Sequence, residues 1–112
     1  MRILRLTRHP ANVAQLKELD RIFGGDAEVI EVSETVPSGE RVKELVKVHQ
    51  AQVLEAVLPL PILAEVVHPK TGVQIPVLRA AMVRDLKPDG SAAFTFSHYE
   101  KVVRMVIETE QL

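Results

Sequence analysis

Short apolar segments alternate with helix-like segments along residues 1–68, and this alternation restricts the fold more than any other feature of the sequence. The apolar segments span residues 3–6, 29–32 and 53–58, and helix-periodic segments span 11–23, 40–49 and 62–67. Parallel strands need a crossover connection between them, which a helix of this length usually supplies. The pattern therefore predicts a parallel βαβαβ arrangement, in which ligands bind beyond the carboxyl ends of the strands.

The segment 11–23 is the clearest helix of the sequence. Pro10 fits its first turn, where a missing N–H is tolerated, and Gly24-Gly25 follows its last turn. The spacing of its apolar residues predicts an inner face that carries Val13, Leu16, Leu19, Ile22 and Phe23, while Gln15, Lys17, Glu18 and Arg21 face away.

The segment 51–58 has two interpretations. Val53, Ala56 and Val57 continue the helical period of the preceding segment, in which Ser38 is the expected N-cap, so one long helix to Leu58 fits the pattern. The segment is also short and continuously apolar, as a strand buried on both faces is. We favour the strand, closed by Pro59, with a short helix at 62–67 after it.

The composition becomes β-rich after residue 69. We expect strands within 73–84, at 94–96 and at 102–107, with a turn at Lys87-Pro88-Asp89-Gly90 and a polar connection at 97–101. The predicted fold is thus a single three-layer, Rossmann-like α/β domain over residues 1–112. Its βαβαβα portion covers 1–68, and an antiparallel β extension covers 69–112.

Composition excludes several classes of function. The chain has 112 residues, no cysteine and a net charge of −1, which rules out a thiol nucleophile, a disulfide framework and a strong global attraction to nucleic acid. No apolar segment approaches the ~20 residues of a membrane span, and no signal-peptide pattern is present, so we expect a cytoplasmic protein. A single asparagine and many valines are typical of a heat-adapted source.

Motifs for metals and common cofactors are also missing. The four histidines, His9, His49, His68 and His98, lack the spacing of a metal site. No glycine-rich phosphate-binding turn and no nucleophile motif occurs, and the basic residues do not interleave with aromatics as nucleic-acid-binding motifs require. We therefore expect no metal, no cofactor and no nucleic-acid partner.

The first candidate site lies where the first strand meets the first helix. Thr7, Arg8 and His9 offer a hydroxyl, a cationic group suited to phosphate and a side chain that titrates near neutrality. Ser33 and Glu34 end the second strand, at the same edge of a parallel sheet. Together they predict a site for an anionic or nucleotide-like ligand, whether as regulator or as substrate. The alternative is that both are ordinary solvated loops.

Two further features carry a hypothesis each. His98 and Tyr99 stand in the densest cluster of titratable groups and are added to the candidate site, although such a segment is also an ordinary polar connection. Arg79 interrupts an apolar strand region, so it is expected to be at least half buried. Its predicted partner is Glu31, Glu55 or Glu65, with an anionic ligand as the alternative.

The segment 58–63, Leu-Pro-Leu-Pro-Ile-Leu, has no polar side chain. It is either covered by the core or exposed for a partner. A chain of this size buries such a segment and a valine-rich sheet more easily as a dimer, and unpaired edge strands favour symmetric pairing. We predict a homodimer. An interaction or structural protein that acts through this surface is the alternative to a ligand-binding protein.

Overall fold

Strands and helices alternate in the computed structural model, which describes residues 1–106 and 108–112. Within those residues the elements are β1 (Arg2–Leu6), α1 (Val13–Phe23), β2 (Glu28–Val32), α2 (Gly39–Val48), β3 (Val53–Ala56), α3 (Leu60–Val66), β4 (Val77–Leu86) and β5 (Ala92–Lys101). The predicted alternation is confirmed. The strand favoured at 53–58 is present as β3 and ends at Ala56, and the segment does not continue α2.

The strands form one sheet in the order β2-β1-β3-β4-β5. β1 pairs in parallel with β2 and β3, β3 pairs in parallel with β4, and β5 returns antiparallel to β4. This is the predicted parallel start with an antiparallel extension. The central strands β1 and β3 are almost completely buried, because helices cover both of their faces.

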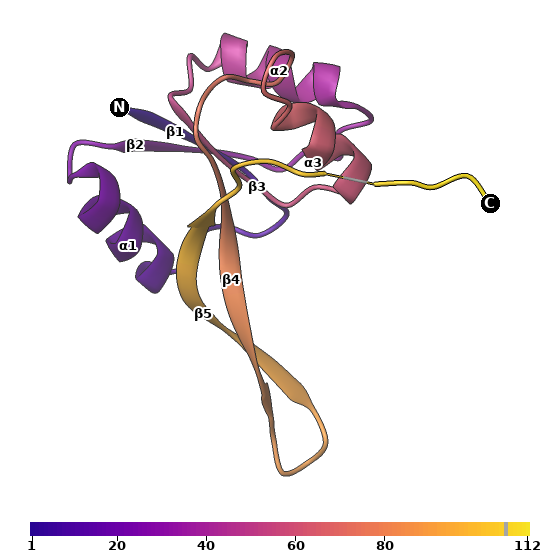
Figure 1. Cartoon of the computed structure of the whole chain (residues 1–112). Helices are drawn as coiled ribbons and strands as arrows, with labels where there is room; N and C mark the ends of the chain where they lie inside the picture. The colour runs from indigo at the N-terminus through magenta and orange to yellow at the C-terminus, as the bar shows by residue number, and fades with distance from the viewer. Residues whose placement is uncertain (107) are drawn as a thin grey trace.

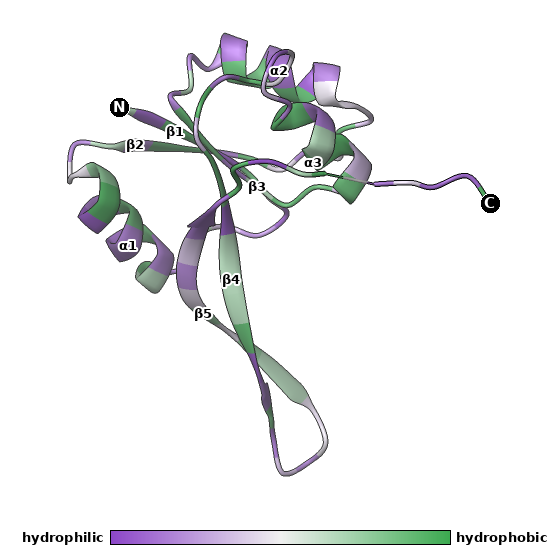
Figure 2. Cartoon of the chain, viewed as in Figure 1, coloured by the Kyte–Doolittle hydropathy of each residue, from purple (hydrophilic) through white to green (hydrophobic). Residues whose placement is uncertain are grey.

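The two faces of the sheet carry separate apolar clusters (Figure 1). Successive side chains of a strand point to opposite faces. Ile3 therefore packs with Leu19 of α1, whereas Leu4 packs in the cluster that contains Val42 of α2 and Leu63 of α3. In Figure 2 the apolar colour is accordingly concentrated in the central strands and on the inner sides of α2 and α3. The predicted three-layer architecture is confirmed.

Helix α1 differs from the prediction in its start and its inner face. Asn12 is the N-cap and forms a reciprocal capping box with Gln15, so Pro10 lies in the preceding loop and not in the first turn. Gln15 and Leu19 are the buried residues, while Val13 is 68% exposed. Phe23 packs partly against the same cluster as Leu19, while Leu16 and Ile22 stay exposed like Val13.

Helices α2 and α3 agree more closely with the prediction. The Ser38 hydroxyl accepts a hydrogen bond from the Arg41 backbone N–H and caps α2, as expected. Val42, Leu45 and Val46 of α2 are buried against the sheet. Helix α3 begins at Leu60, two residues before the predicted start, because Pro59 and Pro61 both fit a first helical turn.

The carboxyl-terminal strands differ in their bounds. β4 extends to Leu86, and β5 covers 92–101, so the predicted polar connection at 97–101 is part of a strand. Residues 102–106 form no strand, contrary to the prediction, and Ile107 lies outside the described residues. The cause is pairing: β5 follows β4 from Leu86↔Ala92 to Leu78↔Lys101, with one irregularity at Ala81/Met82. β4 begins at Val77, so it offers almost no strand partner to the chain after Lys101.

The outer parts of β4 and β5 extend well past the helices (Figure 1). We call residues 82–96 the arm. The radius of gyration is 15.5 Å, whereas a compact chain of this length has about 13 Å. The larger radius reflects the arm, which extends away from the helices and has both faces exposed.

No helix in the described part of the chain is long and apolar enough to cross a membrane. The cytoplasmic location and the heat-adapted source stay predictions.

Candidate functional site

A charged residue stands at the same level in three neighbouring strands. Arg5 of β1 lies opposite Glu31 of β2 and opposite Glu55 of β3 in the sheet register. Arg5 is 3% exposed and Glu55 1% exposed, so both members of this ion pair are buried. Buried charges persist only when they are paired and hydrogen-bonded.

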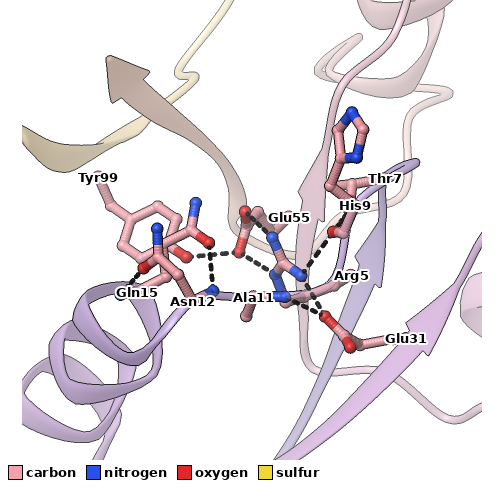
Figure 3. Close-up of polar contacts among 9 residues, drawn as sticks. All are labelled: Arg5, Thr7, His9, Ala11, Asn12, Gln15, Glu31, Glu55 and Tyr99. Carbon is pink, nitrogen blue, oxygen red and sulfur yellow. Dashed lines mark hydrogen bonds and ion pairs between the residues drawn. The ribbon is translucent and has the colours of Figure 1, made fainter. Parts of the chain in front are cut away.

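The geometry of the cluster satisfies its polar groups (Figure 3). Arg5 binds Glu55 with two hydrogen bonds, from Nε to Oε1 at 2.8 Å and from Nη2 to Oε2 at 3.1 Å. Its Nη1 donates to Glu31. The Tyr99 hydroxyl of β5 donates to Glu55 Oε1 at 2.7 Å, which brings a fourth strand into the network. Among the described residues, no buried side-chain nitrogen or oxygen lacks a partner.

Charge and burial shift two pKa values in this cluster. Burial alone lowers the pKa of Arg5, but hydrogen bonds and charge from Glu55 outweigh it, and the pKa lies above the ordinary value. Burial and the hydrogen bond to Glu55 raise the pKa of Tyr99 above its ordinary value. Arg5 is therefore a fixed cation, and Tyr99 is a neutral donor at physiological pH.

The cluster also fixes the loop that connects β1 to α1. Arg5 Nη1 donates to the His9 carbonyl at 3.3 Å, and the Thr7 hydroxyl donates to the same carbonyl at 2.7 Å. Glu31 accepts the Ala11 backbone N–H at 2.7 Å. The loop is thus held by its backbone, and in Figure 3 the His9 ring points away from the cluster.

Of the three carboxylates predicted as partners of Arg79, Glu31 and Glu55 do pair with a buried arginine, but Glu65 does not, and the arginine is a different one. Arg79 is exposed and pairs only with Glu100, at 3.4 Å, because β4 leaves the covered part of the sheet after Leu78. The buried arginine that pairs with Glu31 and Glu55 is Arg5. The signal was present in the sequence: the apolar segments 3–6, 29–32 and 53–58 each have a charged residue at their third position.

A cavity of about 580 Å³ opens beside this cluster, at the carboxyl ends of β1 and β3. Apolar side chains form much of its wall: Leu6, Val36, Val57, Leu58, Ala80 and Met82. Polar groups come from Arg5, Glu55 and the two loops that follow β1 and β2. A volume of this size, with an apolar wall and a few polar groups, is typical of small-molecule sites.

The structure brings part of the predicted site together. Thr7, Arg8 and His9 line the cavity with Glu34, so the two loops do meet at this edge. Ser33 and His98 are not among its lining residues, and His98 is exposed with its Nδ1 2.9 Å from the Ser97 hydroxyl. Tyr99 reaches the site only through Glu55.

Charge balance in the cavity favours an anion. Arg41 binds Glu34 with two hydrogen bonds of 2.8 Å, which neutralise that carboxylate and lower its pKa. Glu55 is paired with Arg5, which Glu31 shares, so the excess negative charge of this cluster lies at Glu31, outside the cavity lining. Arg8 has no ion pair or side-chain hydrogen bond within the described part of the chain, and it is exposed at the cavity. The cavity therefore carries one uncompensated cation.

No group of three or more histidine or carboxylate side chains in the described residues is arranged to hold a metal ion.

Alkaline pH is expected to destabilise the protein through Tyr99. Because its pKa is raised in the folded state, the unfolded chain loses the phenolic proton first, at about pH 10. Stability should then fall as the pH rises above that value. Urea unfolding at pH 8 and pH 11 tests this in the wild type and in Tyr99→Phe. An equal loss of stability in both proteins would contradict the assignment.

Comparison with known protein families, with curated proteins and with solved structures gave no match. The structure itself shows an α/β protein with a mostly parallel five-stranded sheet and a cavity at the carboxyl ends of its strands.

Proposed function

We propose that the protein binds a small anionic ligand with an apolar or aromatic part, such as a nucleotide, in the cavity at the carboxyl ends of β1 and β3. The observation that carries the proposal is the combination of an apolar wall with one uncompensated cation, Arg8, in a cavity of about 580 Å³. A guanidinium at such a position suits a phosphate or carboxylate. The apolar wall suits a base or another ring.

The rigid loop supports this proposal. Arg5 and Thr7 hold the backbone at His9, so Arg8 is presented from a fixed support. A preorganised cation binds an anion with a smaller loss of conformational entropy than a mobile one. Binding energy would then come mostly from Arg8 and from burial of the ligand's apolar part.

Thermal unfolding in the presence of candidate ligands tests the proposal. Nucleotides, sugar phosphates and inorganic phosphate are added at low salt to the wild type and to Arg8→Ala. A ligand at ~100 times its dissociation constant adds about 2.7 kcal/mol of stability, which raises the melting temperature by several degrees. We expect a nucleotide to raise it in the wild type and to lose most of this effect in Arg8→Ala.

Arg84→Ala is the matched control. It removes the same charge from an exposed arginine that does not line the cavity. Its ligand response should equal that of the wild type. No response of the wild type to any of these compounds, or an equal response in Arg8→Ala, would overturn the proposal.

We also propose that the chain forms a homodimer, with an expected mass of twice 12.5 kDa in sedimentation. The supporting observation is the exposed arm, with Leu86 74% and Phe94 64% exposed. The predicted partner segment 58–63 has less support, because Leu63 is buried and Ile62 packs partly against the core. Only Leu60 of its large side chains is mostly exposed.

A further inference from the structure

We infer that two copies of the chain join through the outer edge of β5, with the two β5 strands antiparallel and a twofold axis at Thr95. This inference rests on the proposed homodimer and names its surface. In this dimer the β5 strand of a second copy pairs with the outer edge of β5, and the two arms form one four-stranded ribbon.

The position of β5 supplies the first argument. It is the last strand of the sheet, so its outer backbone groups have no strand partner. Along the arm it pairs only with β4, and no helix covers either face (Figure 1). A two-stranded ribbon is marginally stable in water, whereas four strands support one another.

The side chains of this edge offer no protection against pairing. Monomeric proteins usually place proline or a charged residue, especially lysine, on such an edge. Residues 91–97, Ser-Ala-Ala-Phe-Thr-Phe-Ser, contain none of these. A second copy therefore meets no like charge along seven residues.

Phe94-Thr95-Phe96 within this segment reads the same in both directions, which favours a copy of the strand over an unrelated partner. With the twofold axis at Thr95, Phe94 lies opposite Phe96 of the second copy, and Ala93 lies opposite Ser97. An isologous contact requires this self-complementarity. Directly opposed aromatic residues stabilise an antiparallel pair of strands.

One face of the arm carries both phenylalanine side chains, which a wider ribbon would bring together. In the β4–β5 register Met82 lies opposite Phe96, Arg84 opposite Phe94, and Leu86 opposite Ala92, so these side chains share one face. Pairing of two β5 strands places the two phenylalanine rows next to each other on that face. Phe94, which is 64% exposed in the single chain, then gains an apolar neighbour.

Opposite charges at the twofold axis test the inference directly. In a Thr95→Lys dimer the two lysines would face each other across the twofold axis, and in a Thr95→Glu dimer the two glutamates would do so. Each variant alone should sediment at the chain mass of 12.5 kDa, while the wild type sediments at twice that mass. An equimolar mixture of the two variants should regain the doubled mass, because lysine then faces glutamate.

Val83→Lys is the matched control. Val83 pairs with Thr95 but lies on the inner strand β4. In the dimer its two copies are separated by three strand spacings, about 14 Å, beyond the Debye length at 0.1 M salt. This variant should keep the doubled mass. Circular dichroism of the full chain confirms that each variant is folded.

The possible failures are distinguishable. A wild type of 12.5 kDa overturns both the homodimer and this surface. A doubled mass in both single Thr95 variants overturns the β5 edge as the contact surface but leaves the homodimer standing. In that case, a Leu60→Glu variant that sediments at the chain mass assigns the contact to the 58–63 segment. A mixture that stays at the chain mass overturns the β5 pairing.

Discussion

Replacing Glu55 by alanine is expected to lower the free energy of unfolding by about 3–5 kcal/mol. The substitution leaves the Arg5 guanidinium, 3% exposed, without the partner that accepts two of its hydrogen bonds. It also removes the acceptor of the Tyr99 hydroxyl. Arginine cannot escape by losing its proton, so the full cost of a buried charge remains. Urea unfolding at fixed chain concentration measures the loss.

Glu31→Ala is the matched control for this prediction. It removes the other carboxylate of the same arginine, but the Glu31 side chain is 41% exposed. Water can replace it, and the expected cost is about 1 kcal/mol or less.

The double variant Arg5→Met, Glu55→Leu provides a second check. It removes both charges together, so it should be more stable than Glu55→Ala alone. A cost below about 1 kcal/mol for Glu55→Ala would show that water solvates Arg5 from the cavity and would contradict the prediction.

Replacing Leu54 by alanine is expected to cost about 2–5 kcal/mol. Leu54 is fully buried in the middle of the sheet, with Leu4 of β1 and Val77 of β4 as its strand neighbours. Its side chain belongs to the cluster beneath α2 and α3. The neighbours on both sides are held by backbone pairing, so they collapse little into the space left behind.

Val48→Ala serves as the comparison for Leu54→Ala. Val48 ends α2 and is 71% exposed, so its truncation should change stability by no more than about 0.5 kcal/mol. Equal small effects of the two substitutions in urea unfolding would mean that the core around β3 is loosely packed. That result would contradict the complete burial of Leu54 in the sheet.

The architecture could be predicted from the sequence because its signals are local. Apolar segments and helical periods lie within short windows, and the parallel pairing follows from their alternation. The bounds of β5 could not be predicted in the same way. Strand ends depend on where β4 stops offering a partner, and that depends on contacts between residues distant in the sequence.

The predicted inner face of α1 was right for Leu19 and Phe23 and wrong for its other residues, for a related reason. Periodicity identifies an apolar stripe, but the area of sheet available beneath the helix decides how much of it is covered. Here Gln15 is buried because its side chain accepts the Asn12 N–H in the capping box. Val13 and Ile22 stay exposed.

The loops of the candidate site could be predicted from the sequence, but the buried ion-pair cluster around Arg5 could not. Arg8, His9 and Glu34 follow strands that end at one edge, so their proximity follows from topology. Arg5 was overlooked because it stands inside an apolar strand, where one charge does not change the pattern. Comparison of the three strands at the same level would have shown Arg5 between two glutamates.

The attachment of the β1–α1 loop through the His9 carbonyl separates two roles that many proteins combine in the same side chains. The loop's shape depends on a backbone oxygen, which every amino acid supplies, and on Arg5 and Thr7. The side chains at positions 8 and 9 contribute little to folding. Mutation at these two positions can therefore alter what the protein recognises without an accompanying loss of stability, so this loop is a place where new specificities can evolve.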